Sequence, residues 1–234
     1  MIIEGPLINA TFISRPNRFI VIVKINNNLF KSHLADPGRL KELLIPNANL
    51  LVRKIKNRLD RKTRFSTIMV LHNGFYISLV STLPNKFVKQ AIVKKELPIL
   101  KDYKIISAEY TIGNHRIDFL LKNLKNEDFF LEVKSVTLSE KGIAKFPDAI
   151  TTRGLKHVKL LTDMVKNGKN AGILFVCQRS DVNLFKPMWE RDPKFSQALL
   201  TGFNSGLKVW CISTELSKEY ITFKKIIPFQ LNKD

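Results

Sequence analysis

The chain has 234 residues, of which 44% are hydrophobic and 25% are charged. This length and composition suffice to bury a substantial core in one large domain or two small ones, and they exclude a disordered, collagenous or coiled-coil chain. Lys and Arg number 39 and Asp and Glu number 20, which gives a formal net charge of +19. So large an excess indicates a polyanionic partner, with nucleic acid as the first candidate.

The first residues and the cysteines indicate the compartment. Glu4 and Pro6 interrupt the apolar start that a signal peptide needs, and no apolar run approaches the ~20 residues of a membrane span. Cys177 and Cys211 each lie inside an apolar run, and no Cys-x-x-Cys pair is present to hold zinc. We therefore expect a cytoplasmic protein without a membrane partner.

The first 81 residues carry short β-type runs separated by turn signals such as Arg-Pro-Asn-Arg at 15–18 and Asn-Gly at 73–74. Five or six strands with this spacing, and no long helical pattern between them, predict a small closed barrel. The runs lie at 7–14, 19–25, 29–35, 49–55, 66–72 and 75–81.

The pattern changes after this region, because residues 86–97 place apolar side chains at helical intervals. We therefore expect a boundary near Leu83–Asn85 and two domains, residues 1–84 and residues 85–234.

The second domain is predicted to contain two more helices, one capped by Thr151 or Thr152 and one starting at Asp192-Pro193. The element order is helix, three strands, helix, strand, helix, strand, which predicts an α/β domain. Its strands are expected at 103–112, 115–123, 128–138, 171–178 and 207–213.

Two carboxylates interrupt apolar strands in this domain. Asp118 and Glu132 would each be costly to bury alone, and a short turn between their strands would bring them side by side. Two like charges at close range favour a divalent cation between them. Lys134 lies two residues beyond Glu132 and shares its face of the strand. With the main-chain carbonyl of Val133, these groups can hold Mg²⁺ or Mn²⁺ and stabilise a phosphate undergoing substitution.

The spacing Asp-x(13)-Glu-x-Lys on paired strands resembles the pattern of the PD-(D/E)XK nuclease superfamily, whose core has the same α-β-β-β-α-β order. The alternative is a surface salt bridge between Lys134 and one carboxylate, since Glu-x-Lys is common on solvated strands.

Longer segments, among them LEVKSVTL, KFPDAITTRGLKHVKLL and HLADPGRLKELLIP, resemble the sugar fermentation stimulation protein A family. This resemblance extends from about Thr11 to Lys208. It implies an N-terminal OB-like β-barrel, a restriction-endonuclease-like (PD-(D/E)XK) α/β domain, and DNA binding with little sequence preference. The nuclease pattern falls on Asp118, Glu132 and Lys134, which are therefore the predicted catalytic residues, while Asp118, Glu132 and Val133 are the predicted metal ligands.

A basic run at 53–64 is predicted to bind DNA through the barrel. The first 84 residues hold 13 basic and 4 acidic residues, against 26 and 16 in the other 150, so the charge density is higher in the barrel. The alternative is a solvated loop that only keeps the protein soluble. The basic residues of the run are Arg53, Lys54, Lys56, Arg58, Arg61, Lys62 and Arg64.

Arg153 and His157 are one helical turn apart and are also predicted to contact DNA, or, for His157, to transfer a proton. A purely structural histidine is the alternative. Asp148, in Phe146-Pro147-Asp148, follows Glu132 in the chain and is expected in the loop before the helix.

Two functions remain open from the sequence. One is a DNA-binding protein with weak sequence preference, possessing an intact nuclease-like site but acting as a regulator, as the family's name suggests. The other is an active Mg-dependent DNA endonuclease or exonuclease. Double-stranded DNA is the favoured partner, and RNA binding through the barrel stays open.

Overall fold

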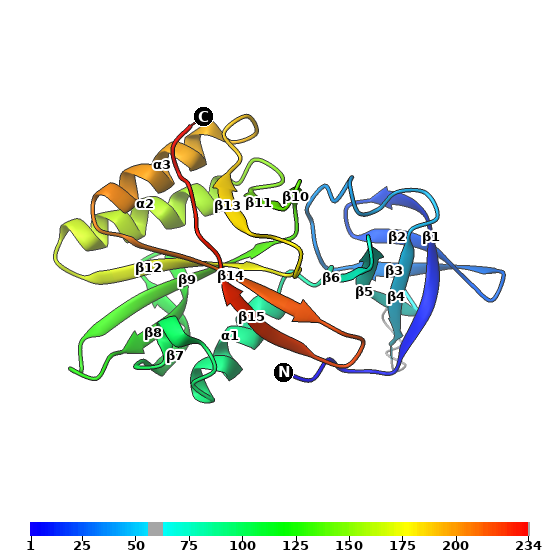
Figure 1. The fold of residues 1–234 in the computed structure, drawn as a ribbon, viewed down its shortest axis with the longest axis horizontal. Coiled ribbons are helices and arrows are strands. Elements are labelled where there is room, and N and C mark those ends of the chain that lie inside the picture. Colours follow the sequence, from blue (N-terminus) through cyan, green and yellow to red (C-terminus); the bar gives the residue numbers. More distant parts are fainter. Residues whose placement is uncertain (56–62, 234) are drawn as a thin grey trace.

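The computed structural model describes residues 1–55 and 63–233, which form a β-barrel at one end and an α/β domain at the other (Figure 1). The sheet of the barrel has the strand order β3-β2-β1-β4-β5-β6, and an additional parallel pairing of β3 with β5 closes β1 to β5 into a ring. The bounds are β1 Leu7–Asn17, β2 Ile20–Ile25, β3 Asn28–Leu34, β4 Asn49–Lys54, β5 Phe65–His72 and β6 Phe75–Ser78.

Asparagine and glycine turns set the register of this barrel. Asn26 and Asn27 join β2 to β3, and Asn73 and Gly74 join β5 to β6; all four have positive φ. Two-residue turns of this kind match the twist of paired strands, and Asn and Gly adopt positive φ most readily. The barrel predicted from the sequence is confirmed.

The α/β domain is built on a second six-stranded sheet of order β15-β14-β12-β9-β8-β7. The middle strands β9, β12 and β14 are parallel, whereas β7, β8 and β15 are added antiparallel. The bounds are β7 Lys104–Ile112, β8 His115–Lys122, β9 Asp128–Val136, β12 Asn170–Cys177, β14 Lys208–Leu216 and β15 Ile221–Ile226.

Helices cover both faces of this sheet, α1 on one side and α2 with α3 on the other (Figure 1). Thr151 Oγ1 accepts a hydrogen bond from the Gly154 amide at the start of α2, and Asp192 Oδ1 accepts one from the Phe195 amide at the start of α3. Both are caps of the predicted kind. The bounds are α1 Leu83–Val93, a 3₁₀ turn Pro98–Leu100, α2 Thr152–Lys166 and α3 Pro193–Asn204.

Several elements differ from the sequence-based expectation. Helix α1 begins at Leu83 rather than at residue 86. Pro84 is tolerated there because backbone amides in the first turn of a helix have no hydrogen-bond partner within the helix, so the missing amide hydrogen of proline costs nothing. The small sheet β10-β11-β13 and the edge strand β15 were not expected, since two- and four-residue strands and a half-exposed edge carry little periodic signal. The small sheet contains β10 Ser139–Glu140, β11 Ile143–Phe146 and β13 Leu184–Pro187.

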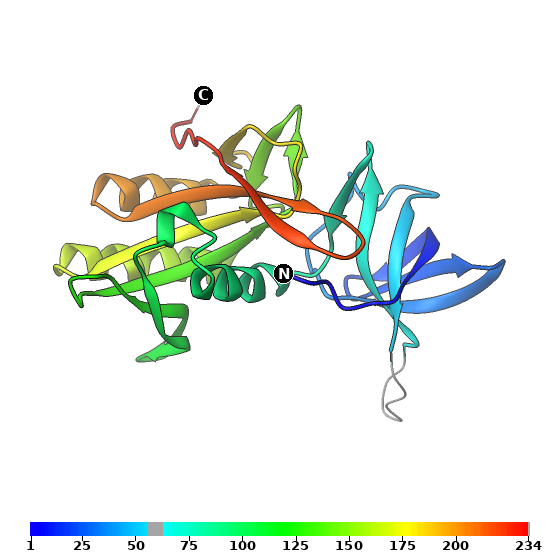
Figure 2. The same ribbon diagram turned by 60° about the horizontal axis from the view of Figure 1, so that its bottom comes forward.

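Contacts between the barrel and the α/β domain include hydrogen bonds of the N-terminal segment and of the loop after β3. The N-terminal segment pairs with the β14–β15 hairpin, where the Ile3 amide donates to the Glu219 carbonyl at 2.7 Å. Figure 2 shows this hairpin reaching from the sheet toward the barrel. On the other side, the Arg39 amide donates to Asp148 Oδ2 at 2.9 Å.

The Arg39–Asp148 contact depends on Gly38, and the Asp36 carboxylate lies close to the same glycine. A Cβ on Gly38 would lie 2.1 Å from Asp148 Oδ2, so a larger residue would force the Asp148 carboxylate out of its position. Asp36 Oδ1 accepts from the Gly38 amide at 2.8 Å. Burial raises the pKa of Asp36 from 3.8 to about 6, and the negative charge of Asp148 acts in the same direction.

The raised pKa of Asp36 predicts a pH-dependent effect of Asp36→Asn on stability. Protonation of Asp36 is favoured in the folded state, so its contribution is fully present below pH 3.8 and is lost as the pH rises through about 6. The variant should therefore gain up to roughly 3 kcal/mol relative to wild type between about pH 4 and about pH 7. Urea unfolding of both proteins at the two pH values measures this, since other carboxylates cancel in the difference. A difference that does not vary with pH would contradict the burial of an ionisable Asp36.

Candidate functional site

Asp118 lies on β8 just where this strand separates from β9. The backbone pairing of the two strands ends with Phe119 opposite Leu131. Beyond this pair, the Asp118 carboxylate, instead of the β8 backbone, forms the hydrogen bond to β9. Its Oδ2 accepts a hydrogen bond from the Val133 amide at 2.7 Å, and its Oδ1 accepts one from the Asn85 side chain of α1 at 2.6 Å. The orientation of the Asp118 carboxylate is therefore fixed from two elements.

Burial raises the pKa of Asp118 from 3.8 to about 6, and the neighbouring negative charge of Glu132 acts in the same direction. The hydrogen bond from the Val133 amide and the charge of Lys134 oppose this effect without cancelling it. The two carboxylates thus lie close enough to repel each other. Such a pair is stabilised by any positive charge placed between them.

Glu132 is 3% exposed and carries an unequal set of contacts on its two oxygens. Lys134 Nζ donates to Oε1 at 2.5 Å, and His157 Nδ1 donates to the same oxygen at 2.5 Å. Oε2 is buried and has no hydrogen-bond partner among the described residues. Burial raises the pKa of Glu132, but the His157 hydrogen bond and the Lys134 charge outweigh it, so this pKa lies below its ordinary value.

Lys134 is positioned by strand alternation on the same face as Glu132 and has a side chain only 13% exposed. The ion pair considered as the alternative to a functional site is present, but it is buried rather than on the surface. Lys134 also lines a cavity of about 340 Å³ between the domains, together with Asp36, Asp148 and Arg153. Asp148 lies in the loop before α2, as expected.

His157 is 4% exposed and approaches Glu132 from α2. The sequence did not reveal this contact, because the two residues are 25 positions apart on different elements and a single histidine has no diagnostic spacing. Arg153, one turn earlier, is exposed. Both residues line a second cavity of about 480 Å³ with His115, whose ring centroid lies 6.4 Å from that of His157.

The basic run of the barrel is described only at its ends. Arg53 forms an ion pair with Glu4 at 2.6 Å, whereas Lys54 and Arg64 are exposed. These residues flank the connection between β4 and β5. The other predicted DNA-binding residues of the run, Lys56, Arg58, Arg61 and Lys62, lie outside the described residues.

Within residues 1–55 and 63–233 there is no group of three or more His, Cys, Asp or Glu side chains arranged to hold a metal ion. Any cation at Asp118 and Glu132 would therefore need further oxygen ligands from the main chain or from a bound molecule. In the same part of the chain, no helix is long and apolar enough to span a membrane.

A closed barrel followed by an α/β sheet with Asp, Glu and Lys on its inner strands defines a two-domain protein with an endonuclease-like fold. Residues 13–79 match the family description "SfsA N-terminal OB domain", and residues 82–220 match "Sugar fermentation stimulation protein RE domain". The chain belongs to the sugar fermentation stimulation protein family.

Relatives cover nearly the whole chain. The sugar fermentation stimulation protein homolog of Clostridium tetani is 41% identical, over 96% of this chain and 97% of its own length. That of Alkaliphilus metalliredigens is 39% identical, over 94% of each. A solved structure of Pyrococcus furiosus SfsA in complex with Ca²⁺ superposes with a TM-score of 0.88 at 29% identity, covering 97% of both chains.

Proposed function

We propose that this protein binds DNA with weak sequence preference and cleaves its phosphodiester bonds in a reaction that depends on a divalent cation. The observation that carries the proposal is Glu132 Oε2, a buried carboxylate oxygen without a partner among the described residues, next to Asp118 and on the same face as Lys134. An unsatisfied buried oxygen of this kind is costly unless a ligand completes its contacts.

The donor set fits Mg²⁺ or Mn²⁺. Asp118 and Glu132 supply hard carboxylate oxygens. The Val133 amide points at Asp118, and because the amide and carbonyl of one strand residue face the same side, the Val133 carbonyl faces that side too. The Ca²⁺ complex of the Pyrococcus furiosus relative supports a divalent cation in this family's fold. When bound, such a cation supplies positive charge that offsets the carboxylates and polarises a phosphodiester.

The protein's own residues orient the site and stabilise charge. Asn85 and the Val133 amide hold Asp118, while His157 holds Glu132 through the oxygen that Lys134 also contacts. The Lys134 ammonium is therefore placed where negative charge would develop on a phosphate, and a charge fixed in advance needs no reorganisation during the reaction. A regulator that only binds DNA would gain nothing from two buried carboxylates beside a polyanion.

The barrel is proposed as the main DNA anchor, with Lys54 and Arg64 among the groups that contact phosphate. Double-stranded DNA is the proposed partner of this surface. A reducing compartment, the cytoplasm, is the proposed location, because Cys177 and Cys211 are buried free thiols whose Sγ atoms lie 3.6 Å apart.

Metal binding is tested with Glu132→Gln. This change removes the charge and one oxygen ligand, so the affinity for Mn²⁺ or Mg²⁺ should fall at least about tenfold. Calorimetric titration of wild type and variant measures it. Glu109→Gln, which neutralises a carboxylate whose side chain is 69% exposed, is the matched control and should bind as wild type does. Equal affinity in wild type and Glu132→Gln would reject the site.

DNA binding by the barrel is tested through its salt dependence. Replacing Lys54 and Arg64 by Ala should reduce the slope of log K against log salt by about 0.9 for each phosphate that the variant no longer neutralises. The control replaces Lys89 and Lys101 by Ala. Both are exposed residues of the α/β domain; Lys89 lies in α1 and Lys101 follows α1 in the chain. If both double variants bind duplex DNA with the same slope, the barrel residues do not contact phosphate.

Catalysis is tested with Lys134→Met, which removes the ammonium but keeps both carboxylates and much of the side-chain volume. Cleavage of DNA with Mg²⁺ should fall by ~10² or more, the scale of losing one electrostatic stabiliser, while metal affinity is retained. Lys122→Met, on β8 and paired with Asp128 at 3.8 Å, is the control.

Three results separate the alternative roles of Lys134. A wild-type protein that binds metal but cleaves nothing is a binding protein only. A much lower melting temperature of Lys134→Met would show that Lys134 has a structural role. Cleavage at the wild-type rate in Lys134→Met removes this residue from the mechanism.

A further inference from the structure

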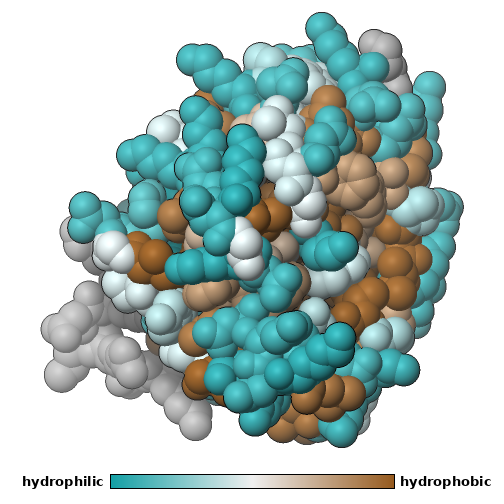
Figure 3. Space-filling view, turned by 90° about the vertical axis from the view of Figure 1, so that its left-hand side faces the viewer, coloured by the Kyte–Doolittle hydropathy of each residue, from teal (hydrophilic) through white to brown (hydrophobic). Residues whose placement is uncertain are grey.

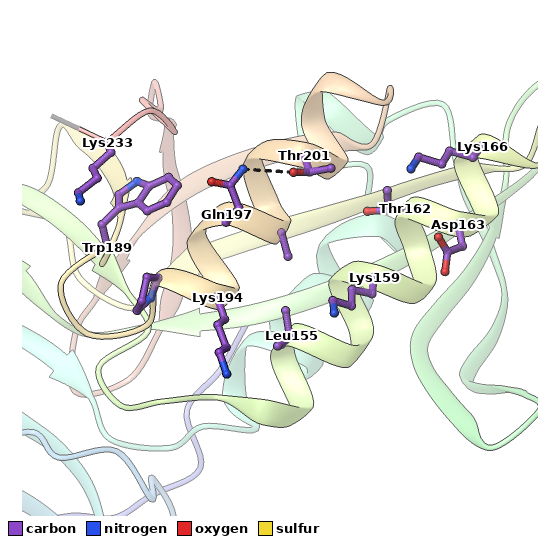
Figure 4. A pocket seen from close by; sticks show the side chains of 12 residues that line it. Leu155, Lys159, Thr162, Asp163, Lys166, Trp189, Lys194, Gln197, Thr201 and Lys233 are labelled. Atoms are coloured by element: carbon purple, nitrogen blue, oxygen red, sulfur yellow. Dashed lines mark hydrogen bonds between the residues drawn. The ribbon is translucent and has the colours of Figure 1, made fainter.

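A cavity of about 800 Å³ lies outside the carboxylate site, in a groove between α2 and α3. Figure 4 shows the groove between the two helices, with Trp189 and Lys233 at one end and Thr201 and Lys166 toward the other. Leu155, Pro193 and Ala198 contribute apolar surface to its lining. The end of the α/β domain seen in Figure 3 shows the same mixture, with hydrophobic residues reaching the surface between long hydrophilic side chains.

Smaller hollows that share lining residues with one another lie between the groove and the carboxylate site. A hollow of about 350 Å³ shares Lys159 with the groove and Lys156 with the cavity that Arg153 and His157 line. Arg153 in turn lines the cavity that contains Lys134. We call the cations on this side of α2, namely Arg153, Lys156, Lys159 and Lys166, the α2 track. Their spacing places them along one side of the helix over about 20 Å.

The charge along α2 and the groove is strongly one-sided. The α2 track and the groove lysines Lys194 and Lys233 supply six cations, against one acid, Asp163, in the lining of the groove and of the adjoining hollow of about 350 Å³. The cavity that contains Lys134 also includes Asp36 and Asp148. Within residues 1–55 and 63–233, none of the six cationic side chains forms an ion pair or hydrogen bond. A row of unpaired cations that ends at a phosphodiester-type site is complementary to a nucleic-acid backbone rather than to an isolated anion.

The apolar lining distinguishes a single strand from a duplex. Bases of a duplex are stacked inside it, so a duplex lying across the groove would contact the lysines and leave Trp189 and Leu155 unused. Trp189 Nε1 already donates to the Leu231 carbonyl at 3.0 Å, which leaves the face of the indole ring, not its polar edge, for a ligand. Unpaired bases stack on such aromatic faces while lysines contact the phosphates.

We infer that the α2 track and the α2–α3 groove bind single-stranded DNA, and that this strand leads into the site at Glu132 and Lys134. The second half of this inference rests on the proposed function, whereas the first half does not. The substrate class it names is DNA with a single-stranded arm, held by the α/β domain, next to a duplex held by the barrel.

Fluorescence of Trp189 tests the binding half directly. Trp189 and Trp210 are the two tryptophans, so Trp210→Phe leaves Trp189 as the reporter, and Trp189→Phe leaves Trp210, which packs against Phe129 at 5.5 Å between ring centroids. With chelator present, oligodeoxythymidylate of about 12 nucleotides should quench the first variant and not the second. A blunt duplex should quench neither. Quenching by an acidic peptide but not by the oligonucleotide would overturn the inference in favour of a protein partner.

Charge reversal tests the track. Lys159→Glu with Lys194→Glu should raise the Kd for the oligonucleotide by about tenfold or more, because two phosphate contacts become repulsive. Lys89→Glu with Lys101→Glu changes the net charge equally on the other side of the sheet and should have little effect. Equal weakening by the two double variants, with unchanged melting temperatures, would overturn the inference.

Cleavage assays keep this inference separate from the proposed function. Metal-dependent cleavage of duplex DNA without Trp189 quenching overturns the single-strand groove and supports the function. Quenching without any cleavage supports the groove as a binding site and overturns the proposed catalysis. Preferential cleavage of DNA with a single-stranded arm, abolished in Lys159→Glu with Lys194→Glu, supports both.

Discussion

Glu132 carries a negative charge in the interior of the α/β domain, and one of its oxygens is bound by both Lys134 and His157. Burial disfavours the charged form of a carboxylate, and for Glu132 these two contacts outweigh that effect and keep its pKa below the ordinary value. The arrangement requires β9 at an inner position of the sheet, α2 packed across it, and β8 separating from β9 at Asp118. Much of the domain's architecture thus serves to bury and hold two carboxylates.

The partial satisfaction of this cluster is its most informative property. Most buried side-chain polar atoms have at least one hydrogen-bond partner, because an unsatisfied buried oxygen carries a desolvation cost. Here Oε2 of Glu132 has no partner in the part of the chain that the structure describes, while burial raises the pKa of the neighbouring Asp118 to about 6. The raised pKa of Asp118 follows from burial and from the negative charge of Glu132. The two carboxylates are thus only partly compensated by the groups that contact them.

One contact between the two domains lies beside the cavity that contains Lys134. The Asp36–Arg39 loop of the barrel contacts Asp148 and helps to line the cavity that contains Lys134. A ligand in this cavity would touch residues of both domains. Gly38 makes the close approach of the loop possible, since a side chain there would collide with Asp148.

The sequence by itself determined most elements and singled out the candidate residues of the carboxylate site. Alternation, Asn-Gly turns and helix caps predicted the barrel, the α/β order and the two capped helices, because these signals are local. Charges inside apolar strands pointed to Asp118 and Glu132 for the same reason, since an unpaired buried charge is conspicuous in a sequence.

Only the tertiary structure decided what these residues touch. His157 meets Glu132, and Asn85 meets Asp118, across elements whose separation in the chain carries no pattern. Short strands such as β13 form because a neighbouring strand, here β11, is available for pairing, and not because their own residues strongly favour extended structure. The placement of Lys134, Arg153 and Lys159 along neighbouring hollows likewise depends on how α2 packs against the sheet and α3, which is a property of the folded chain as a whole.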